Sequence, residues 1–242
     1  MAANPQITRY DYNGKAEPCL VIRPDAPTKA AHMLCLIPPL FAEANRMRRL
    51  MVSVMRYIAT THHIASMLPD LPGTMDSRTL LADTGFTDWQ KALAMAAEQC
   101  GSVTHSAAIR GGAALDGALP DIPHWRLSPI PPAQQLRTLA RSEIASLRDA
   151  GEATPALSDM LGSGRQDGLM LAGYTLGPSM VAALMDRHNI ADGADRTVRL
   201  AEDTKPADAR LDGPPLWLRA EPGDDQSLAT AIAGDIAQWM TE

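Results

Sequence analysis

The segment VTHSAAIRGGAAL, residues 103–115, decides the fold of this chain. Its first part, residues 103–109, is a short stretch that predicts a buried strand. Gly111 and Gly112 follow, and they predict a tight turn that leads into a helix. The residue at the apex of this turn is Arg110. A guanidinium is not deprotonated in a protein, so Arg110 can serve neither as a nucleophile nor as a general base.

The composition is typical of a soluble globular protein with one hydrophobic core. The chain has 242 residues, of which 45% are hydrophobic and 21% are charged. This length suits one α/β domain over residues 1–242. The net charge of −6 is mildly acidic, which argues against a nucleic-acid partner.

The sequence predicts a cytoplasmic protein that does not insert into a membrane. The chain begins without a basic region followed by an apolar stretch, so we expect no secretory signal. The longest nearly apolar run, residues 33–42, is interrupted by two prolines and is far shorter than the roughly 20 residues of a membrane helix. The three cysteines, Cys19, Cys35 and Cys100, are odd in number and have no metal or redox spacing, which fits a reducing compartment. Cys19 and Cys35 lie in apolar strand-like runs, which predicts small buried thiols.

Strand and helix patterns alternate along most of the chain. Asn13-Gly14 predicts a hairpin between residues 7–13 and 19–23, and the apolar run 33–37 predicts a central parallel strand. One helical stripe is formed by Met47, Leu50, Met51, Val54 and Ile58. Further strands are expected at 64–68, 125–130, 196–201 and 215–220, and helices at 87–100, 132–150, 178–188 and from 228 to the C-terminus. This alternation predicts an α/β fold whose mostly parallel central sheet is covered by helices on both faces.

Residues 132–189 break the alternation. Within them, residues 151–168 are polar and glycine-rich, which predicts a loop, and residues 168–177 predict a small hairpin. We expect the whole segment to be a cap-like insert over the carboxyl edge of the sheet, where sites form in open α/β folds.

Five short blocks carry a resemblance to a known family. They lie at 38–49, 68–77, 109–113, 172–178 and 213–217. In these blocks and in their order, the chain resembles the type 2 hydrolases associated with the exosortase A system, which belong to the α/β-hydrolase superfamily. The chain departs from the family at Met75, where a second glycine is usual. The resemblance implies an α/β-hydrolase fold and a cytoplasmic protein encoded alongside exosortase-dependent export and exopolysaccharide production. It implies no substrate.

The superfamily pattern predicts that the standard catalytic triad is missing, which makes the chain a pseudoenzyme candidate. In α/β-hydrolases the nucleophilic serine lies at a sharp strand-to-helix turn, the elbow, with the sequence G-x-S-x-G. An acidic residue and then a histidine follow it along the chain. Here the elbow places Arg110 at the serine position, and the resembled family itself tends to carry arginine there. Glu202 or Asp203 suits the acid, but no histidine follows His188.

Two interpretations of Arg110 stay open. In the first, Glu43 forms an ion pair with Arg110 that fills the site where the serine of an α/β-hydrolase would act. Asp70 and Asp76 are other candidate partners. In the second, Arg110 and nearby backbone N–H groups hold the carboxylate or phosphate of a small anionic ligand, or an anionic group of a partner protein. The candidate ligand-binding residues are Arg110, Gly111, Gly112, Glu43, Leu40 and Asn45. We expect no cofactor and no metal, because His62-His63 lacks ligand spacing to other donors.

The alternative is an active hydrolase of an ester, a thioester or an acylated polysaccharide, working through a displaced site. Ser106 is one candidate nucleophile, although its place in the elbow strand predicts a side chain within the sheet packing. Ser163 and Ser179 are weaker candidates, and His105 is expected to be a core residue.

Other conspicuous side chains have simpler interpretations. Arg46, Arg48 and Arg49 are expected on a solvated helix face, with Arg46 near the mouth of the pocket. Trp89 and Trp217 are expected to anchor the core.

Overall fold

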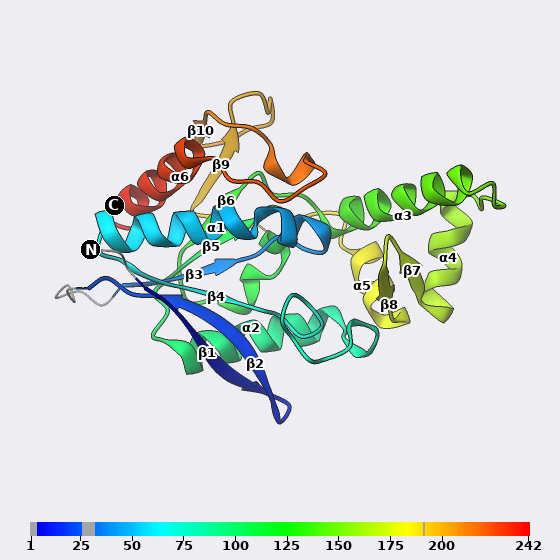
Figure 1. The fold of residues 1–242 in the computed structure, drawn as a ribbon, viewed down its shortest axis with the longest axis horizontal. Coiled ribbons are helices and arrows are strands. Elements are labelled where there is room, and N and C mark those ends of the chain that lie inside the picture. Colours follow the sequence, from blue (N-terminus) through cyan, green and yellow to red (C-terminus); the bar gives the residue numbers. More distant parts are fainter. Residues whose placement is uncertain (1–3, 26–31, 191) are drawn as a thin grey trace.

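An eight-stranded sheet forms the centre of the molecule in the computed structural model, which describes residues 4–25, 32–190 and 192–242 (Figure 1). The strand order is β1-β2-β4-β3-β5-β6-β9-β10. The strands are β1 Pro5–Tyr12, β2 Lys15–Ile22, β3 Met33–Ile37, β4 Ala65–Pro69, β5 His105–Ile109, β6 His124–Leu127, β9 Arg196–Leu200 and β10 Ala209–Leu211. The prediction that the chain begins without a secretory signal rests partly on residues 1–3, which lie outside the described residues.

Six strands, β3 to β6, β9 and β10, pair in parallel with their neighbours, while β1 and β2 add an antiparallel edge. The predicted hairpin is confirmed: β1 pairs with β2 through a turn at Asn13 and Gly14, with φ of 54° and 75°. Positive φ at both turn residues is the geometry that matches the twist of the two strands. The predicted, mostly parallel central sheet is therefore present.

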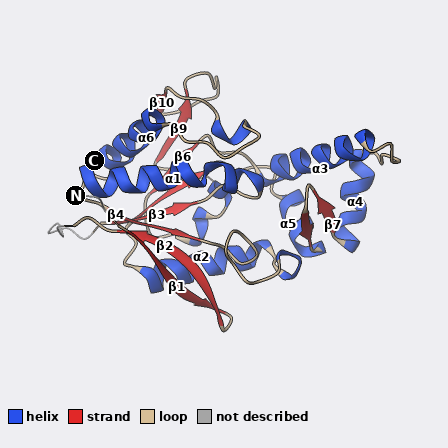
Figure 2. Cartoon of the chain, viewed as in Figure 1, coloured by secondary structure: helices blue, strands red, loops and turns tan. Residues whose placement is uncertain are grey.

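Helices cover both faces of the sheet (Figure 2). On one face, α1 (Ala42–Thr61) packs beside α6 (Gln226–Trp239), and α2 (Phe86–Cys100) covers the other. The α1 stripe predicted from the sequence is fully buried in the core on its face. In the described part of the chain, no helix is both long enough and apolar enough to cross a membrane. Cys19 and Cys35 are buried free thiols, as expected, and Cys100 is one too.

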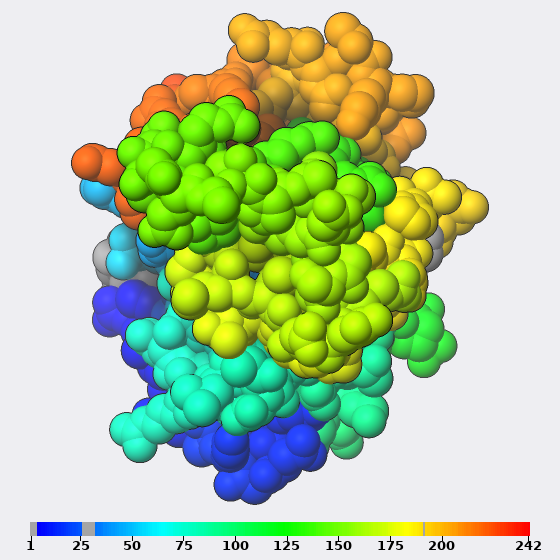
Figure 3. All heavy atoms as spheres, turned by 90° about the vertical axis from the view of Figure 1, so that its right-hand side faces the viewer, coloured from blue at the N-terminus to red at the C-terminus, as the bar shows by residue number. Residues whose placement is uncertain are grey.

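The segment 132–189 stands apart from the central sheet. It contains the helices α3 (Pro132–Asp149), α4 (Leu157–Asp167) and α5 (Pro178–Asp186), and a hairpin of β7 (Leu169–Leu171) and β8 (Tyr174–Leu176). Figure 3 shows this segment spread across the middle of the face at which the parallel strands end. The prediction of a loop over residues 151–168 is wrong. Helix α4 forms there because Met160 and Leu161 bury against the core and Gly164 lets Leu169 pack closely.

Two further predictions are wrong. The strand expected at 215–220 is a short 3-10 helix, Leu216–Leu218, because prolines cannot donate to a sheet ladder; the last strand is β10 instead. The helix expected after the elbow is only a pair of 3-10 turns, Arg110–Ala114 and Asp116–Ala118. Glycines favour helices poorly, and the elbow is held tightly against the loop after β3. A last short 3-10 helix is η1, Leu81–Asp83.

Candidate functional site

Strained backbone marks the carboxyl edge of the sheet. Arg110, the first residue after β5, has a φ of 56°. Phe41 follows β3 and Ser128 follows β6, with φ of 56° and 43°. These strands are neighbours in the sheet, so three non-glycine residues in the left-handed region meet at one edge. Such strain persists where the surroundings enforce it, and it clusters at functional sites.

Two glycines let the elbow approach its surroundings closely. A Cβ atom on Gly112 would lie 2.3 Å from the carbonyl oxygen of Pro38. A Cβ atom on Gly111 would lie 2.0 Å from Oε1 of Gln135, on the first turns of α3. A side chain at Gly112 would meet backbone that cannot easily move, and one at Gly111 would displace the amide of Gln135. The turn therefore needs these glycines for close contact.

The Arg110 side chain is enclosed by three groups. Its Nε donates to Oε2 of Glu43 at 3.1 Å, and its Nη2 donates to Oε1 of Glu43 at 3.3 Å. Its Nη1 donates to the carbonyl oxygen of Ser128 at 3.1 Å. The guanidinium also lies over the ring of Trp217, 4.5 Å from the centroid. The side chains of Arg110 and Glu43 are 13% and 14% exposed, so the pair is largely withdrawn from water.

The fold explains why Glu43 faces the elbow. Glu43 lies in the first turn of α1, which begins directly after the loop from β3, and β3 is the neighbour of β5. An acidic side chain is favourable at a helix N-terminus. Three of the five N–H groups of Arg110 donate within the described residues. The other two N–H groups of the guanidinium form no hydrogen bond in the described part of the chain.

The structure brings most of the predicted site residues together. Glu43, Gly111 and Gly112 contact or adjoin Arg110. Leu40 contributes its carbonyl oxygen, which accepts a hydrogen bond from Nε2 of Gln135 at 2.9 Å. Asn45 is exposed on α1, and in the described part of the chain it makes no hydrogen bond to the elbow. Of the predicted residues, Asn45 is the one that the fold leaves outside the cluster.

Comparison with solved structures shows fold relatives along the whole chain. No family model and no curated protein matches the sequence. The structure of Est1E from Butyrivibrio proteoclasticus with ferulic acid bound superposes with a TM-score of 0.61 at 13% identity, covering 97% of this chain and 98% of that one. Mouse alpha/beta hydrolase domain-containing protein 10 gives 0.60 at 13% identity and 98% coverage of both chains. This chain has the α/β-hydrolase fold.

A third relative widens the range of the comparison. A soluble variant of monoglyceride lipase from Saccharomyces cerevisiae, in complex with a substrate analogue, gives a TM-score of 0.58 at 11% identity, over 99% of this chain and 95% of that one. At such identities the likeness establishes the fold alone, because an α/β-hydrolase fold hosts many chemistries.

Sequence reasoning missed three residues of the elbow cluster. Gln135 lies four residues before Leu139 on α3, so it falls on the apolar face, and this position was the signal that its amide is buried. Nothing in the sequence indicated Ser128, because it contacts Arg110 through its backbone carbonyl and adopts a left-handed backbone conformation. Trp217 was expected in the core; it is 7% exposed and also stacks on Arg110.

The basic residues of α1 differ from the prediction of one solvated face. Arg48 pairs with Asp70, with Nη1 and Oδ1 2.5 Å apart, and Asp70 is therefore not a partner of Arg110. Burial raises the pKa of Asp70, and Arg48 partly opposes this. Arg46 donates to the carbonyl oxygen of Trp217 at 3.0 Å, while Arg49 is exposed as expected. Arg48 was mispredicted because its partner is distant in sequence.

Acidic residues at the positions where an α/β-hydrolase would carry its acid and histidine have other partners. Asp203 pairs with Arg199 at 2.8 Å and accepts from the backbone N–H of Lys205. Asp225 caps α6 by accepting from the N–H of Leu228, and Asp224 accepts from Ser53. These carboxylates stabilise loops and the start of α6.

A serine and a histidine meet inside the sheet. The Oγ of Ser106 lies 2.7 Å from Nδ1 of His124, on neighbouring strands β5 and β6. Ser106 is fully buried, as its strand position predicted. His105 packs edge-on against Trp239, with ring centroids 5.1 Å apart. The described residues contain no group of three or more His, Cys, Asp or Glu side chains arranged to hold a metal ion.

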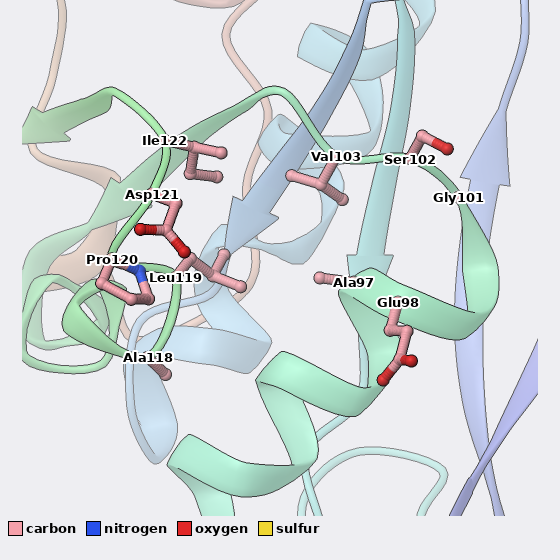
Figure 4. A pocket seen from close by; sticks show the side chains of 10 residues that line it. All are labelled: Ala97, Glu98, Gly101, Ser102, Val103, Ala118, Leu119, Pro120, Asp121 and Ile122. Atoms are coloured by element: carbon pink, nitrogen blue, oxygen red, sulfur yellow. The ribbon is translucent and has the colours of Figure 1, made fainter.

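A separate hollow of about 440 Å³ lies at the amino end of β5, away from the elbow (Figure 4). Val103, Leu119 and Ile122 supply its apolar lining, and Glu98 and Asp121 are acidic side chains of the same hollow. It shares no residue with the elbow cluster.

Proposed function

We propose that this chain binds a small anionic ligand at Arg110 and has given up the standard serine chemistry of its fold. The observation that carries the proposal is the guanidinium itself, which stands at the apex after β5, where the nucleophile of an α/β-hydrolase belongs. Arginine cannot take that role at any accessible pH, but its planar fork is well suited to a carboxylate or a phosphate.

The surroundings of Arg110 support anion binding over a purely structural role. Glu43 takes one edge of the guanidinium, which leaves N–H groups for a second anion. The site is largely shielded from water, which strengthens charge interactions. The small exposed fraction of Arg110 favours a small ligand over a partner protein. We propose that the segment 132–189 acts as a cap over this site.

The biological setting rests on the family resemblance. The five sequence blocks support a cytoplasmic role beside exosortase-dependent export and exopolysaccharide production. In that setting an anionic metabolite, or the acidic end of a saccharide, would be a suitable ligand for Arg110.

Calorimetry with simple anions tests the proposal. We expect acetate or inorganic phosphate, at constant ionic strength, to raise the melting temperature of the wild-type chain in a saturable way. Arg110→Gln should remove this rise, whereas Arg49→Gln should keep it, because the Arg49 side chain is 73% exposed and lies elsewhere on α1. Equal responses of both variants, or no saturable response in the wild type, would overturn the proposal.

A working hydrolase is the second candidate, and one observation favours it. The Ser106–His124 contact has the separation of a nucleophile and its base. Ser106 is nevertheless wholly buried, so a substrate would need the sheet to open. Labelling of the native chain by a fluorophosphonate probe, lost in Ser106→Ala, would establish this alternative and refute the binding-only proposal.

A further inference from the structure

Near Arg110, two buried polar side-chain atoms have no hydrogen-bond partner among the described residues. They are Oε1 of Gln135 and Oγ of Ser128, in residues that are 4% and 1% exposed. An unpaired buried acceptor destabilises a protein, so native chains retain few of them. Two such atoms near one strained turn indicate that a bound ligand supplies their hydrogen bonds.

Gln135 joins the elbow to the loop after β3. Its Nε2 donates to the carbonyl oxygen of Leu40, and its Oε1 lies against Gly111, the residue after Arg110. The amide therefore reaches the two segments that supply the oxyanion hole in an α/β-hydrolase. An amide oxygen can only accept a hydrogen bond, so the group that completes this contact must be a donor.

Ser128 approaches the same guanidinium from β6. Its carbonyl oxygen accepts from Nη1 of Arg110, while its hydroxyl has no partner in the described part of the chain. A left-handed φ of 43° holds this residue in place. A hydroxyl can donate or accept, so Ser128 can serve either a carboxylate oxygen or a neighbouring polar group.

We infer that the ligand of Arg110 is a small carboxylate with a hydroxyl or an amino group on the adjacent carbon. The carboxylate would engage the free N–H groups of Arg110, and the adjacent donor would satisfy the oxygen of Gln135. Both orphan atoms are closed to solvent, so Gln135 must turn about its side-chain bonds as the ligand enters. This inference rests on the proposed anion site and narrows its ligand class.

Lactate and propionate form a matched pair of probes, because they share a carboxylate and nearly the same size but only lactate has the adjacent hydroxyl. We expect dissociation constants, measured by ligand-observed NMR at fixed ionic strength, to favour lactate by about fivefold, the effect of one net hydrogen bond. Gln135→Met should bring the ratio close to one. Gln134→Met is the control and should keep the ratio, because Gln134 is the exposed neighbour on the same turn.

Gln135→Met also removes the hydrogen bond to Leu40, so a second variant tests the inference with that bond intact. Ser128→Ala removes an atom that has no partner among the described residues, so no native hydrogen bond is lost and the chain should fold. We expect it to lower the preference for lactate while propionate binding stays within about twofold.

The outcomes separate this inference from the proposed function. If both acids bind with equal affinity and their binding depends on Arg110, the ligand needs no hydroxyl or amino group on the adjacent carbon. The inference is then wrong, and the proposed anion site stands. If neither acid binds while phosphate still stabilises the chain through Arg110, the inference fails and the proposed function stands; if no anion binds, both fail. A lactate preference that survives in Gln135→Met and in Ser128→Ala would also overturn the inference.

Discussion

The guanidinium of Arg110 lies over the ring of Trp217, with its central carbon 4.5 Å from the ring centroid. The ring belongs to a short 3-10 helix after β10, and its backbone is held by Arg46. Arg110 thus contacts an aromatic ring on one side and donates two hydrogen bonds to the carboxylate of Glu43. Cation–π stacking and a two-point ion pair together fix the orientation of the guanidinium.

A serine in place of Arg110 should not create an active hydrolase. Arg110→Ser would place a hydroxyl at the apex of the elbow, but no histidine follows His188 in the sequence to take its proton. We expect p-nitrophenyl acetate hydrolysis by this variant to equal that of the wild type. Turnover that rises clearly above the wild-type rate and is blocked by a fluorophosphonate would contradict this expectation.

Glu43 and Arg110 should be strongly coupled in stability. Removal of one partner leaves the other charge poorly solvated, so Glu43→Gln should lower the free energy of unfolding by about 2 kcal/mol. The double variant Glu43→Gln/Arg110→Met should lose less than the sum of the single variants, with a coupling of about 1–3 kcal/mol. Urea unfolding measures all four states. Strict additivity would show that the pair contributes nothing as a pair.

The close approach of the elbow predicts different effects at two glycines. Gly112→Ala should lower the free energy of unfolding by about 1–3 kcal/mol, because the new methyl group would lie 2.3 Å from the carbonyl oxygen of Pro38. Gly117→Ala is the matched control, since a Cβ at Gly117 meets nothing within 4 Å. Its stability should stay within about 0.5 kcal/mol of the wild type. Equal effects at both positions would refute the packing argument.

Asp70 should give stability a pH dependence of definite sign. Burial raises its folded-state pKa above the usual 3.8, with Arg48 opposing. An acid with a raised pKa contributes stability that is complete below the unfolded pKa and is lost as the pH rises through the folded pKa. Asp70→Asn should therefore gain stability relative to the wild type as the pH rises from about 4 toward neutrality.

Urea unfolding at a series of pH values checks this prediction. Asp121→Asn, at an exposed position, should follow the wild-type curve in parallel. A difference between Asp70→Asn and the wild type that does not change with pH would show that Asp70 has the same pKa in the folded and unfolded chains.

Local patterns were sufficient for the frame of this protein. The strand within 103–109, the Asn13-Gly14 turn and the buried stripe of α1 each follow from a local pattern or a turn preference that neighbouring residues determine by themselves. The alternation of strands and helices then predicted the mostly parallel sheet, and the glycines after Arg110 predicted the sharp turn.

Only the tertiary structure decided the partners within the site. The sequence favoured Glu43 as the partner of Arg110 and left Asp70 and Asp76 as alternatives. The β3–β5 pairing brings Glu43 to Arg110, and Arg48 pairs with Asp70. The places of Gln135, Ser128 and Trp217 depend on how distant segments pack, as does the 3-10 turn that replaced the expected strand at 215–220. Charge and hydrogen-bond partners are chosen by distance in space, and the order of residues along a chain does not encode that distance directly.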